Sequence, residues 1–453
     1  MFLVTIREVN TLSHVEKDAR ASVNAIPGDP SISVNTIVSH DPYRALRFSD
    51  FRLLFFGTFI STLGSKMVEV ALGWELYERT GSALILGYVG LVLVTPVILF
   101  SLPAGHMADR LQRKRIVITT QALMAFGALG LTIFSYTHSA LILIFGCLLL
   151  MGVATAFNNP ASSALTVQTV PEHAYENAAT WSSSSWQLAS VVGPGLGGLL
   201  IALFHRATPI YLLDAVAVSV YVVLLAFIRG NPRQVALERV REKTTLRSLL
   251  EGVRFLSKTQ IILAAITLDM FAVLLGGATT LLPVYAKDIL HVGPTGLGWL
   301  RAAPSIGAVS VALVLTHRAP FKKAGRTLLL AVAGFGIATI VFGLSRSFWL
   351  SLLMLFLLGG LDNISVVIRG TLLLMRTPDE MRGRVAAINT LFIGASNELG
   401  GFESGLTAQL FGPVLSVAGG GIGTILVVLA VALFWPEMRR LGALRLPEGE
   451  KKG

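Results

Sequence analysis

Several ionisable side chains lie inside long apolar stretches of this 453-residue chain. Eight of them are candidates for a transport pathway, namely Lys66, Glu69, Asp269, Arg301, Asp362, Arg369, Glu398 and Glu403. A charged side chain at the centre of a membrane-spanning helix costs about 3 kcal/mol on insertion scales, so such residues mark a transport pathway or a fixed ion pair. The chemistry open to them is reversible proton binding and recognition of a polar cargo.

Spacing along a helix groups some of these residues. Lys66 and Glu69 are three positions apart and therefore lie on one face, where an internal ion pair is the simpler alternative to a transport role. Asp362 and Arg369 are seven positions apart, which returns them to nearly the same face after two turns.

The six residues of the second half are expected to meet in a polar interior. They comprise four carboxylates and two guanidiniums, so at least one carboxylate is short of a partner and can change between charged and neutral forms. Proton coupling requires such a group. Asp269 is the first candidate because it is the most central, and Glu398 is the second. The alternative is a buried network that only fixes helix packing. Asp214, in the sixth segment and nearer the outer face of the membrane, is expected to cap a local hydrogen-bond network.

The elements that must position these residues are membrane helices. The chain is 53% hydrophobic and 14% charged, whereas soluble domains have about 25% charged residues. About 20 apolar residues are needed to cross roughly 30 Å of hydrocarbon. The sequence predicts an all-α integral membrane protein with twelve such segments, at 52–78, 83–107, 116–137, 140–159, 178–203, 208–229, 259–286, 295–316, 327–345, 348–369, 385–410 and 413–435.

Charges in the connections predict how the helices are oriented. The second, sixth, eighth and tenth connections are rich in arginine and lysine, whereas the odd-numbered ones have only Arg79, Arg206, Lys287 and Arg346. By the positive-inside rule, the even-numbered connections and both termini are cytoplasmic, in a multi-pass protein of the cytoplasmic membrane. The excess of 37 Lys+Arg over 26 Asp+Glu is then a topology signal, and nucleic acid is not an expected partner.

The two halves of the chain repeat one another at an offset of 207 residues. Pro171 corresponds to Pro378, and Gly198 corresponds to Gly405. We therefore expect a cytoplasmic tail at 1–47, a six-helix bundle at 48–229, a cytoplasmic linker at 230–258, a second six-helix bundle at 259–436 and a tail at 437–453. Paired bundles are a transporter architecture with a substrate site near the midplane. Since one chain contains both halves of the pathway, a monomer is expected to function.

The stretch GHMADRLQRK, residues 105–114, resembles the signature loop of the major facilitator superfamily. Gly105, Asp109, Arg110, Arg113 and Lys114 match that loop, and Gln112 replaces its second glycine. The resemblance implies twelve helices and a cytoplasmic gate in which Asp109 pairs with the other half. The candidate partners at the start of the eleventh helix are Arg382 and Arg384. The alternative is that Asp109 caps the third helix while the cations orient the loop.

The stretch LASVVGPGLGG is similar to the Gly-Pro-x-x-Gly-Gly element of drug:proton antiporters in this superfamily. Gly193, Pro194, Gly197 and Gly198 match, and Ala189 replaces the usual first glycine. Three further stretches, around 252–277, 298–308 and 377–405, resemble the branch that contains enterobactin-type siderophore exporters and macrolide-efflux proteins. The resemblance covers about residues 44–440. It implies a secondary active exporter of a small amphipathic molecule, siderophore-like or drug- and macrolide-like, using proton antiport and alternating access.

Other functions are less well supported. A facilitator or proton-coupled importer of a sugar or metabolite is the main alternative, although importers usually lack the Gly-Pro-x-x-Gly-Gly element. An enzyme is not expected, since no catalytic His/Asp constellation or phosphate-binding loop occurs, and the histidines show no metal-ligand spacing. No cofactor or metal is predicted. The expected partners are a small-molecule substrate, protons and the lipid bilayer. Aromatic residues could line the cavity or pack as core, namely Trp74, Trp181, Trp186, Phe271 and Phe392.

The gate interpretation makes a direct prediction. Asp109→Asn removes the charge that pairs the halves, so it should abolish transport while membrane insertion and expression stay intact. Transport rate at matched membrane levels is the measurement, and normal transport by the variant would contradict the gate.

Overall fold

The computed structural model describes residues 41–229, 251, 254–318, 321–378 and 381–442, and the described residues from 43 onward belong to one compact unit. The first half of this unit contains α2 (Ser49–Thr80), α3 (Ala83–Arg110), α4 (Arg113–Tyr136), α5 (Leu141–Gln168), α6 (Tyr175–Phe204) and α7 (Thr208–Phe227). The second half contains α10 (Gln260–Leu275), α11 (Leu282–Val284), α12 (Gly293–Thr316), α13 (Ala324–Leu344), α14 (Phe348–Arg376), α15 (Arg382–Phe411), α16 (Pro413–Phe434) and the short α17 (Pro436–Arg440).

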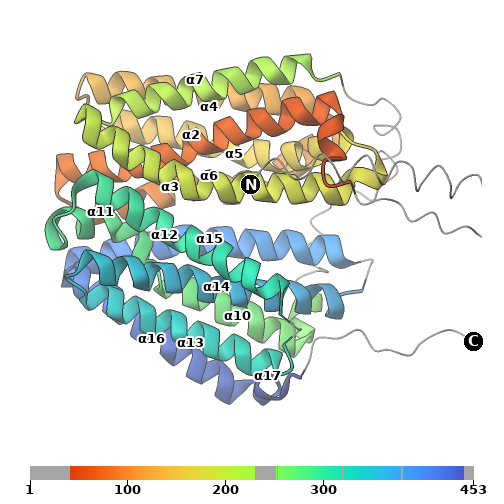
Figure 1. The fold of residues 1–453 in the computed structure, drawn as a ribbon, viewed down its shortest axis with the longest axis vertical. Coiled ribbons are helices and arrows are strands. Elements are labelled where there is room, and N and C mark those ends of the chain that lie inside the picture. The colour runs from red at the N-terminus through yellow and green to blue at the C-terminus, as the bar shows by residue number, and fades with distance from the viewer. Residues whose placement is uncertain (1–40, 230–250, 252–253, 319–320, 379–380, 443–453) are drawn as a thin grey trace, which may run out of the picture. The chain divides into compact units, whose positions relative to one another are not determined.

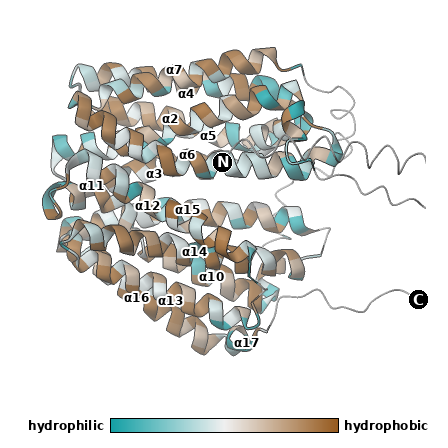
Figure 2. Ribbon diagram, in the orientation of Figure 1, coloured by the Kyte–Doolittle hydropathy of each residue, from teal (hydrophilic) through white to brown (hydrophobic). Residues whose placement is uncertain are grey.

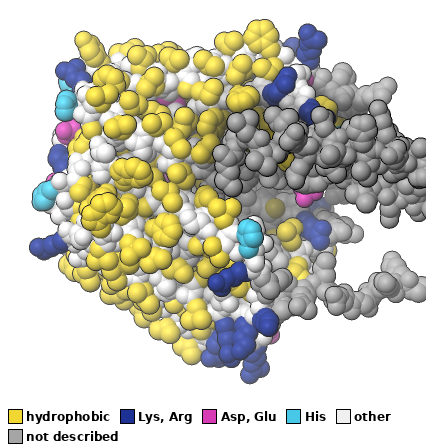
Figure 3. Space-filling view, viewed as in Figure 1, with side chains coloured by type: hydrophobic (Ala, Val, Ile, Leu, Met, Phe, Trp, Pro, Cys, Tyr) yellow, Lys and Arg dark blue, Asp and Glu magenta, His cyan; other side chains and the backbone are white. Residues whose placement is uncertain are grey.

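Length and hydropathy make this a multi-pass membrane protein. Eleven helical segments of the described residues are long and apolar enough to cross a membrane, and α15 completes the twelve that the sequence predicts. The thirty residues of α15 are less apolar because they include Arg382, Arg384, Glu398 and Glu403. Hydrophobic residues follow the helices along most of their length (Figure 2), and apolar side chains cover much of the visible face (Figure 3).

The helices pack as two bundles, as predicted. Helices α2 to α7 pack on one another, and α10 to α16 form the second group (Figure 1). Two helix pairs make the main contacts between the bundles, α6 with α12 and α3 with α15. The sequence repeat is reflected in these contacts, because α6 and α15 are the fifth helices of their respective halves.

The two ends of the bundles differ. At one end, here called the short-loop end, connections of a few residues join α2 to α3, α6 to α7 and α15 to α16. Gly81 and Gly412 allow two of these tight turns, with φ of 62° and 88°, values that side-chain-bearing residues rarely adopt. The opposite end is called the basic end, because α3 finishes there at Arg110 and α13 begins there after Lys322 and Lys323.

The seventh predicted segment, 259–286, is not one continuous helix. After α10 ends at Leu275, Gly276 and Gly277 interrupt it, and η3 (Ala278–Leu281) and α11 follow. The segment then finishes as a π-helical turn, η4 (Tyr285–Ile289). Paired glycines explain the interruption, since they lack the side-chain packing and the helix propensity that would hold the backbone helical.

Backbone contacts bring the two bundles together at the short-loop end. A Cβ on Gly298 of α12 would lie 2.6 Å from the carbonyl oxygen of Pro194 in α6, and one on Gly405 of α15 would lie 3.0 Å from the Cα of Gly87 in α3. These distances leave no room for a side chain, so glycine is required at both crossings. We call these contacts, together with the polar pairs below, the short-loop closure.

Two hydrogen bonds add to the short-loop closure. The hydroxyl of Tyr77, at the end of α2, donates to Asp288 of the second bundle, and the ammonium of Lys287 lies 5.8 Å from the centre of the Tyr77 ring. The hydroxyl of Ser82 donates to the side-chain oxygen of Gln409, over 3.1 Å. The short-loop end is therefore closed by contacts from three helices of the first bundle.

A bulky residue at a glycine crossing should hold this end open. Gly198→Val would overlap Pro294 and Gly298, and overpacking of this kind costs about 1–3 kcal/mol, which shifts an equilibrium roughly 5- to 150-fold. We expect faster maleimide labelling of a cysteine at Phe402, which contacts Tyr88 across the interface, in a Cys147→Ala background.

The matched control lies three residues earlier on the same helix. Gly195→Val adds a side chain where nothing lies within 4 Å of the new Cβ, and should leave the labelling rate unchanged. Equal labelling of the Gly198 and Gly195 variants would contradict the proposed role of the crossing.

Candidate functional site

A charged cluster joins the two bundles near the inner edge of the short-loop closure. Glu69 of α2 lies between two cations: its Oε1 is 2.5 Å from Lys66 Nζ on the same helix, and its Oε2 is 3.3 Å from Nη2 of Arg301 on α12. The predicted Lys66–Glu69 pair is thus present. The Glu69–Arg301 contact is an ion pair between the bundles, which the sequence did not predict.

Glu398 of α15 is the fourth member of this cluster. Its carboxylate lies against Gly90 of α3, where an added Cβ would be 2.6 Å from Oε2. It interacts electrostatically with Glu69, Arg301 and Lys66. Within the described part of the chain, no hydrogen bond or ion pair is found for its carboxylate, although two cations are close. We call Lys66, Glu69, Arg301 and Glu398 the central cluster.

The central cluster is accessible to solvent. The Glu69 side chain is 39% exposed, and Trp186 of α6 is 54% exposed with its ring centre 5.9 Å from Lys66 Nζ. Gly73 and Gly298, each about one turn closer to the short-loop end than Glu69 and Arg301, contact the opposite bundle there. Contacts between the bundles therefore lie on the short-loop side of the cluster.

Arg301 also contacts the interruption in the seventh segment. Its Nη1 donates to the carbonyl oxygen of Thr279 over 3.4 Å, three residues after Gly276. Irregular backbone at membrane depth is tolerated where it lines a cavity or is buried in protein, because its polar groups need partners. One guanidinium therefore contacts α2 and the interrupted segment at the same time.

The six charged residues of the second half do not meet at a single site, contrary to expectation. Asp269 of α10 forms a buried ion pair with Arg369 of α14, and Arg369 Nε also donates to Ser365 Oγ over 3.2 Å. Asp362 interacts electrostatically with both members of that pair. Arg301 and Glu398 belong instead to the central cluster, since α12 and α15 face the first bundle.

Two further acids differ from the sequence predictions. Glu403 of α15 is half-buried, and no interaction is described between it and the central cluster or the Asp269–Arg369 pair. Asp214 of α7 was expected to cap a hydrogen-bond network, which is wrong. Both of its carboxylate oxygens are buried without a hydrogen-bond partner among the described residues, and Oδ1 lies against Gly64 of α2.

The two family motifs have different positions. In the signature loop, Gly105 lies near the end of α3, Arg110 is exposed, and Lys114 Nζ donates to the carbonyl oxygens of Ala226 and Ile228 over 2.9 and 2.6 Å. Lys114 thereby provides hydrogen-bond donors for carbonyl oxygens at the C-terminal end of α7. The side chain of Asp109 lies outside the described part, so its pairing stays a prediction.

The predicted partners of Asp109 have contacts of their own. Arg382 donates to the carbonyl oxygen of Leu374 over 3.3 Å, and Arg384 pairs with Glu251 at 3.0 Å. In the Gly-Pro-x-x-Gly-Gly element of α6, Gly193 packs against Lys66 and Gly197 against Met67, while Pro194 and Gly198 contact α12. This element therefore places α6 against both the central cluster and the second bundle.

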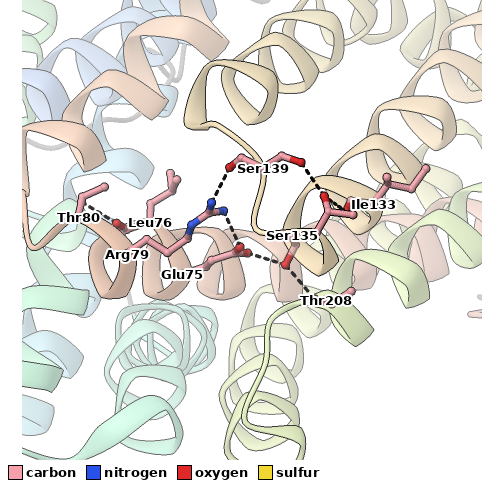
Figure 4. A network of polar contacts seen from close by, with 9 residues as sticks. Glu75, Leu76, Arg79, Thr80, Ile133, Ser135, Ser139 and Thr208 are labelled. Carbon is pink, nitrogen blue, oxygen red and sulfur yellow. Dashed lines mark hydrogen bonds and ion pairs between the residues drawn. The ribbon is translucent and has the colours of Figure 1, made fainter.

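A polar network in the first bundle was missed from the sequence. Glu75 of α2 accepts from Arg79 at 3.3 Å and from Ser135 at 3.0 Å, Ser135 is 2.9 Å from Thr208, and Arg79 Nη2 donates to the carbonyl of Ser139 (Figure 4). The network joins α2, α4 and α7 at the short-loop end. The four-residue spacing of Glu75 and Arg79, which favours a helical ion pair, was its only signal.

Two packed six-helix bundles with a charged cluster between them define a transporter with the major facilitator fold. The sequence profile of the transmembrane secretion effector family, within that superfamily, matches residues 40–445. The chain belongs to this family. Its membership is consistent with both motifs that the sequence contains.

The chain is similar in sequence to two kinds of named exporter. The chain is 27% identical over 391 residues to the enterobactin exporter of Citrobacter koseri, covering 86% of this chain and 92% of that protein. It is 24% identical over 403 residues to the multidrug efflux pump Tap of Mycolicibacterium fortuitum, covering 87% of this chain and 98% of that protein.

The fold is similar to that of two solved transporter structures. The nucleoside transporter NupG matches with a TM-score of 0.68 at 11% identity, covering 85% of this chain and 100% of that chain. A bacterial homologue of the human lysosomal transporter Spinster, in an inward-facing and unoccupied conformation, matches with a TM-score of 0.66 at 15% identity, covering 88% and 98%. At these identities the likeness shows the fold alone.

The buried Asp269–Arg369 pair gives a stability prediction. Arg369→Leu leaves a buried carboxylate without its partner, which costs about 3–5 kcal/mol, whereas replacing both members with apolar residues is often neutral. We expect the single variant to unfold at a lower temperature and Asp269→Leu/Arg369→Leu to recover most of the loss.

Thermal unfolding of purified protein, followed by intrinsic fluorescence, is the measurement. Ser365→Ala is the control, because it removes one hydrogen bond worth about 1 kcal/mol. A double variant that is no more stable than Arg369→Leu would show that the pair does not govern stability here.

Proposed function

We propose that this protein is a secondary active exporter that moves a small amphipathic organic molecule out across the cytoplasmic membrane in exchange for protons. The observation that carries the proposal is the Glu69–Arg301 ion pair between the bundles, with Glu398 beside it. A site shared by both bundles changes its access when they rock, as alternating access requires. The exporter relatives support the outward direction.

The basic end is proposed to face the cytoplasm. It contains the arginine- and lysine-rich connections, which the positive-inside rule assigns to that side. The short-loop closure is then external, and the conformation described here admits cargo from the cytoplasm. Asp109, with Arg382 or Arg384, remains the proposed contact that closes the cytoplasmic side in the opposite conformation.

Glu398 is proposed as the group that exchanges protons. Its carboxylate lies beside two cations without a described ion pair, so its charge can change without breaking a fixed contact. In an antiport cycle it would release a proton to the cytoplasm before cargo binds, and would take one up from outside after cargo leaves. The neighbouring cations Lys66 and Arg301 would respond to each change of charge.

Cargo is proposed to bind beside Trp186 and Lys66. The exposed indole ring offers an apolar face, and the ammonium next to it offers a charge, which together suit an amphipathic molecule with an aromatic portion. The named relatives favour a siderophore-like or drug-like cargo. Asp269, Arg369 and Asp362 are then proposed to hold α10 and α14 together rather than to carry protons.

Coupling is tested in inside-out membrane vesicles with an acidic interior, where export appears as uptake. A catecholate siderophore and a macrolide are the two probes. Because glutamine cannot exchange a proton, Glu398→Gln should reduce the uptake driven by the pH gradient by roughly 100-fold, the lower end of what a positioned acid–base group contributes. The variant should still exchange labelled for unlabelled cargo. That exchange shows that the variant binds and translocates.

The comparison variant is Glu403→Gln, on the same helix but outside the central cluster. It is expected to keep uptake driven by the pH gradient at matched protein levels. Full gradient-driven uptake by Glu398→Gln would contradict the proton role, and uptake of neither probe by the parent protein would remove both cargo classes.

A further inference from the structure

Six exposed basic side chains gather at the basic end of the second bundle. They are Arg318 after α12, Lys322, Lys323 and Arg326 around the start of α13, and Arg439 and Arg440 of α17. Figure 3 shows arginine and lysine side chains together in the region of α17 and α13. Glu437 is the one acid among the described residues of these three segments. We call the six residues the basic cluster.

The scaffold beneath the basic cluster is fixed by packing. Met438 of α17 is fully buried among apolar residues that include Ala324 and Leu328 of α13. The amides of Ala324 and Gly325 donate to the carbonyl oxygens of Gly442 and Leu441, over 3.2 and 3.3 Å. The cations of α13 and α17 are therefore held next to one another rather than on independent loops.

A tryptophan anchors the same region. Trp435, directly before α17, donates from Nε1 to the side-chain oxygen of Gln260 over 2.7 Å. Tryptophan is enriched where membrane helices meet the headgroup layer, because its ring is apolar and its N–H needs a polar partner. The position of Trp435 places the basic cluster at that depth.

Within the described residues, the basic cluster has no partner inside the protein. Among the described contacts, none of its six side chains forms a hydrogen bond or an ion pair. Lys114, at the same end of the first bundle, is instead used internally, on the carbonyl oxygens of Ala226 and Ile228. A packed scaffold that presents six unpaired cations is suited to an external anion.

Exposed apolar side chains lie next to the basic cluster. Leu330 is 72% exposed and lies four residues after Arg326, hence on the same face of α13. Phe434 is 78% exposed and lies two residues before α17. A ligand that fits this surface has a negative headgroup and an attached hydrocarbon chain.

We propose that the basic cluster binds the headgroup of an anionic phospholipid. The guanidiniums of Arg326 and Arg439 would donate to phosphate oxygens, which match the fork geometry of arginine, while acyl chains would lie along Leu330 and Phe434. Basic pockets at the ends of membrane helices recognise anionic lipids in this way. The site is separate from the central cluster and does not depend on the transport proposal.

The test uses the purified full-length protein in mild detergent at low salt, with added phosphatidylglycerol or phosphatidylcholine. The lipid concentration that gives half of the maximal rise in unfolding temperature is measured. Phosphatidylglycerol should stabilise the protein and phosphatidylcholine should not. For Arg326→Gln/Arg439→Gln, the half-maximal lipid concentration should rise about 30-fold. Each cation near an anionic surface contributes roughly a fivefold gain in affinity, and the variant removes two.

Two further double variants serve as controls. Arg52→Gln/Arg115→Gln removes two exposed cations from the same end of the first bundle and should bind phosphatidylglycerol as the parent does. Arg326→Lys/Arg439→Lys keeps the charges and should retain most of the affinity. High salt should weaken the parent's response, because exposed charges are screened.

Three results would overturn the proposal. One is an equal response to both lipids, and another is an unchanged half-maximal concentration in Arg326→Gln/Arg439→Gln when that variant unfolds at the parent's temperature without lipid. The third is an equal effect from inorganic phosphate alone, which would assign the cluster to a small anion instead of a lipid.

Discussion

Backbone contact between glycines is the constraint on which the arrangement of the two bundles depends. At the crossings of α6 with α12 and of α3 with α15, neither helix has room for a Cβ. Helices in lipid gain little from the hydrophobic effect when they associate, so close backbone approach and hydrogen bonds must hold them together. The hydrogen bond from Tyr77 to Asp288 and the one from Ser82 to Gln409 lie beside these crossings.

The same crossings determine the environment of the central cluster. Arg301 lies about one helical turn beyond Gly298 and pairs with Glu69 across the bundles, and Glu398 lies two turns beyond Gly405, against Gly90 of α3. Charges at this position are partly exposed, which lowers their cost, whereas the Asp269–Arg369 pair inside the second bundle is almost fully buried. The first arrangement can change its pairing readily and the second cannot, since a buried ion that loses its partner is strongly destabilised.

Much of the fold could be predicted from local sequence. Apolar length located the helices, and the spacing of Lys66 and Glu69 predicted their pairing, because both signals depend on residues close together in the chain. Asp269 and Arg369 are 100 positions apart, so only the packing of α10 on α14 shows that they meet. The Glu69–Arg301 contact could not be predicted for the same reason. Because Asp269 is paired with Arg369, Glu398 replaces it as the proposed proton carrier. The paired glycines Gly276 and Gly277 indicated an interruption, but the apolar residues on both sides of them predicted one continuous membrane-spanning helix.

The pairing of Lys66 with Glu69 also has a consequence for biogenesis. Helix α2 is made first, whereas Arg301 is more than two hundred residues later in the chain. During that interval α2 must enter the bilayer without its eventual partner, and its own helical contacts are with α6 and α7, which also follow it. Two opposite charges one turn apart neutralise each other within a single helix. The nascent segment thus enters the membrane with no net charge at this position, and the later arrival of α12 converts a local neutralisation into a link between domains.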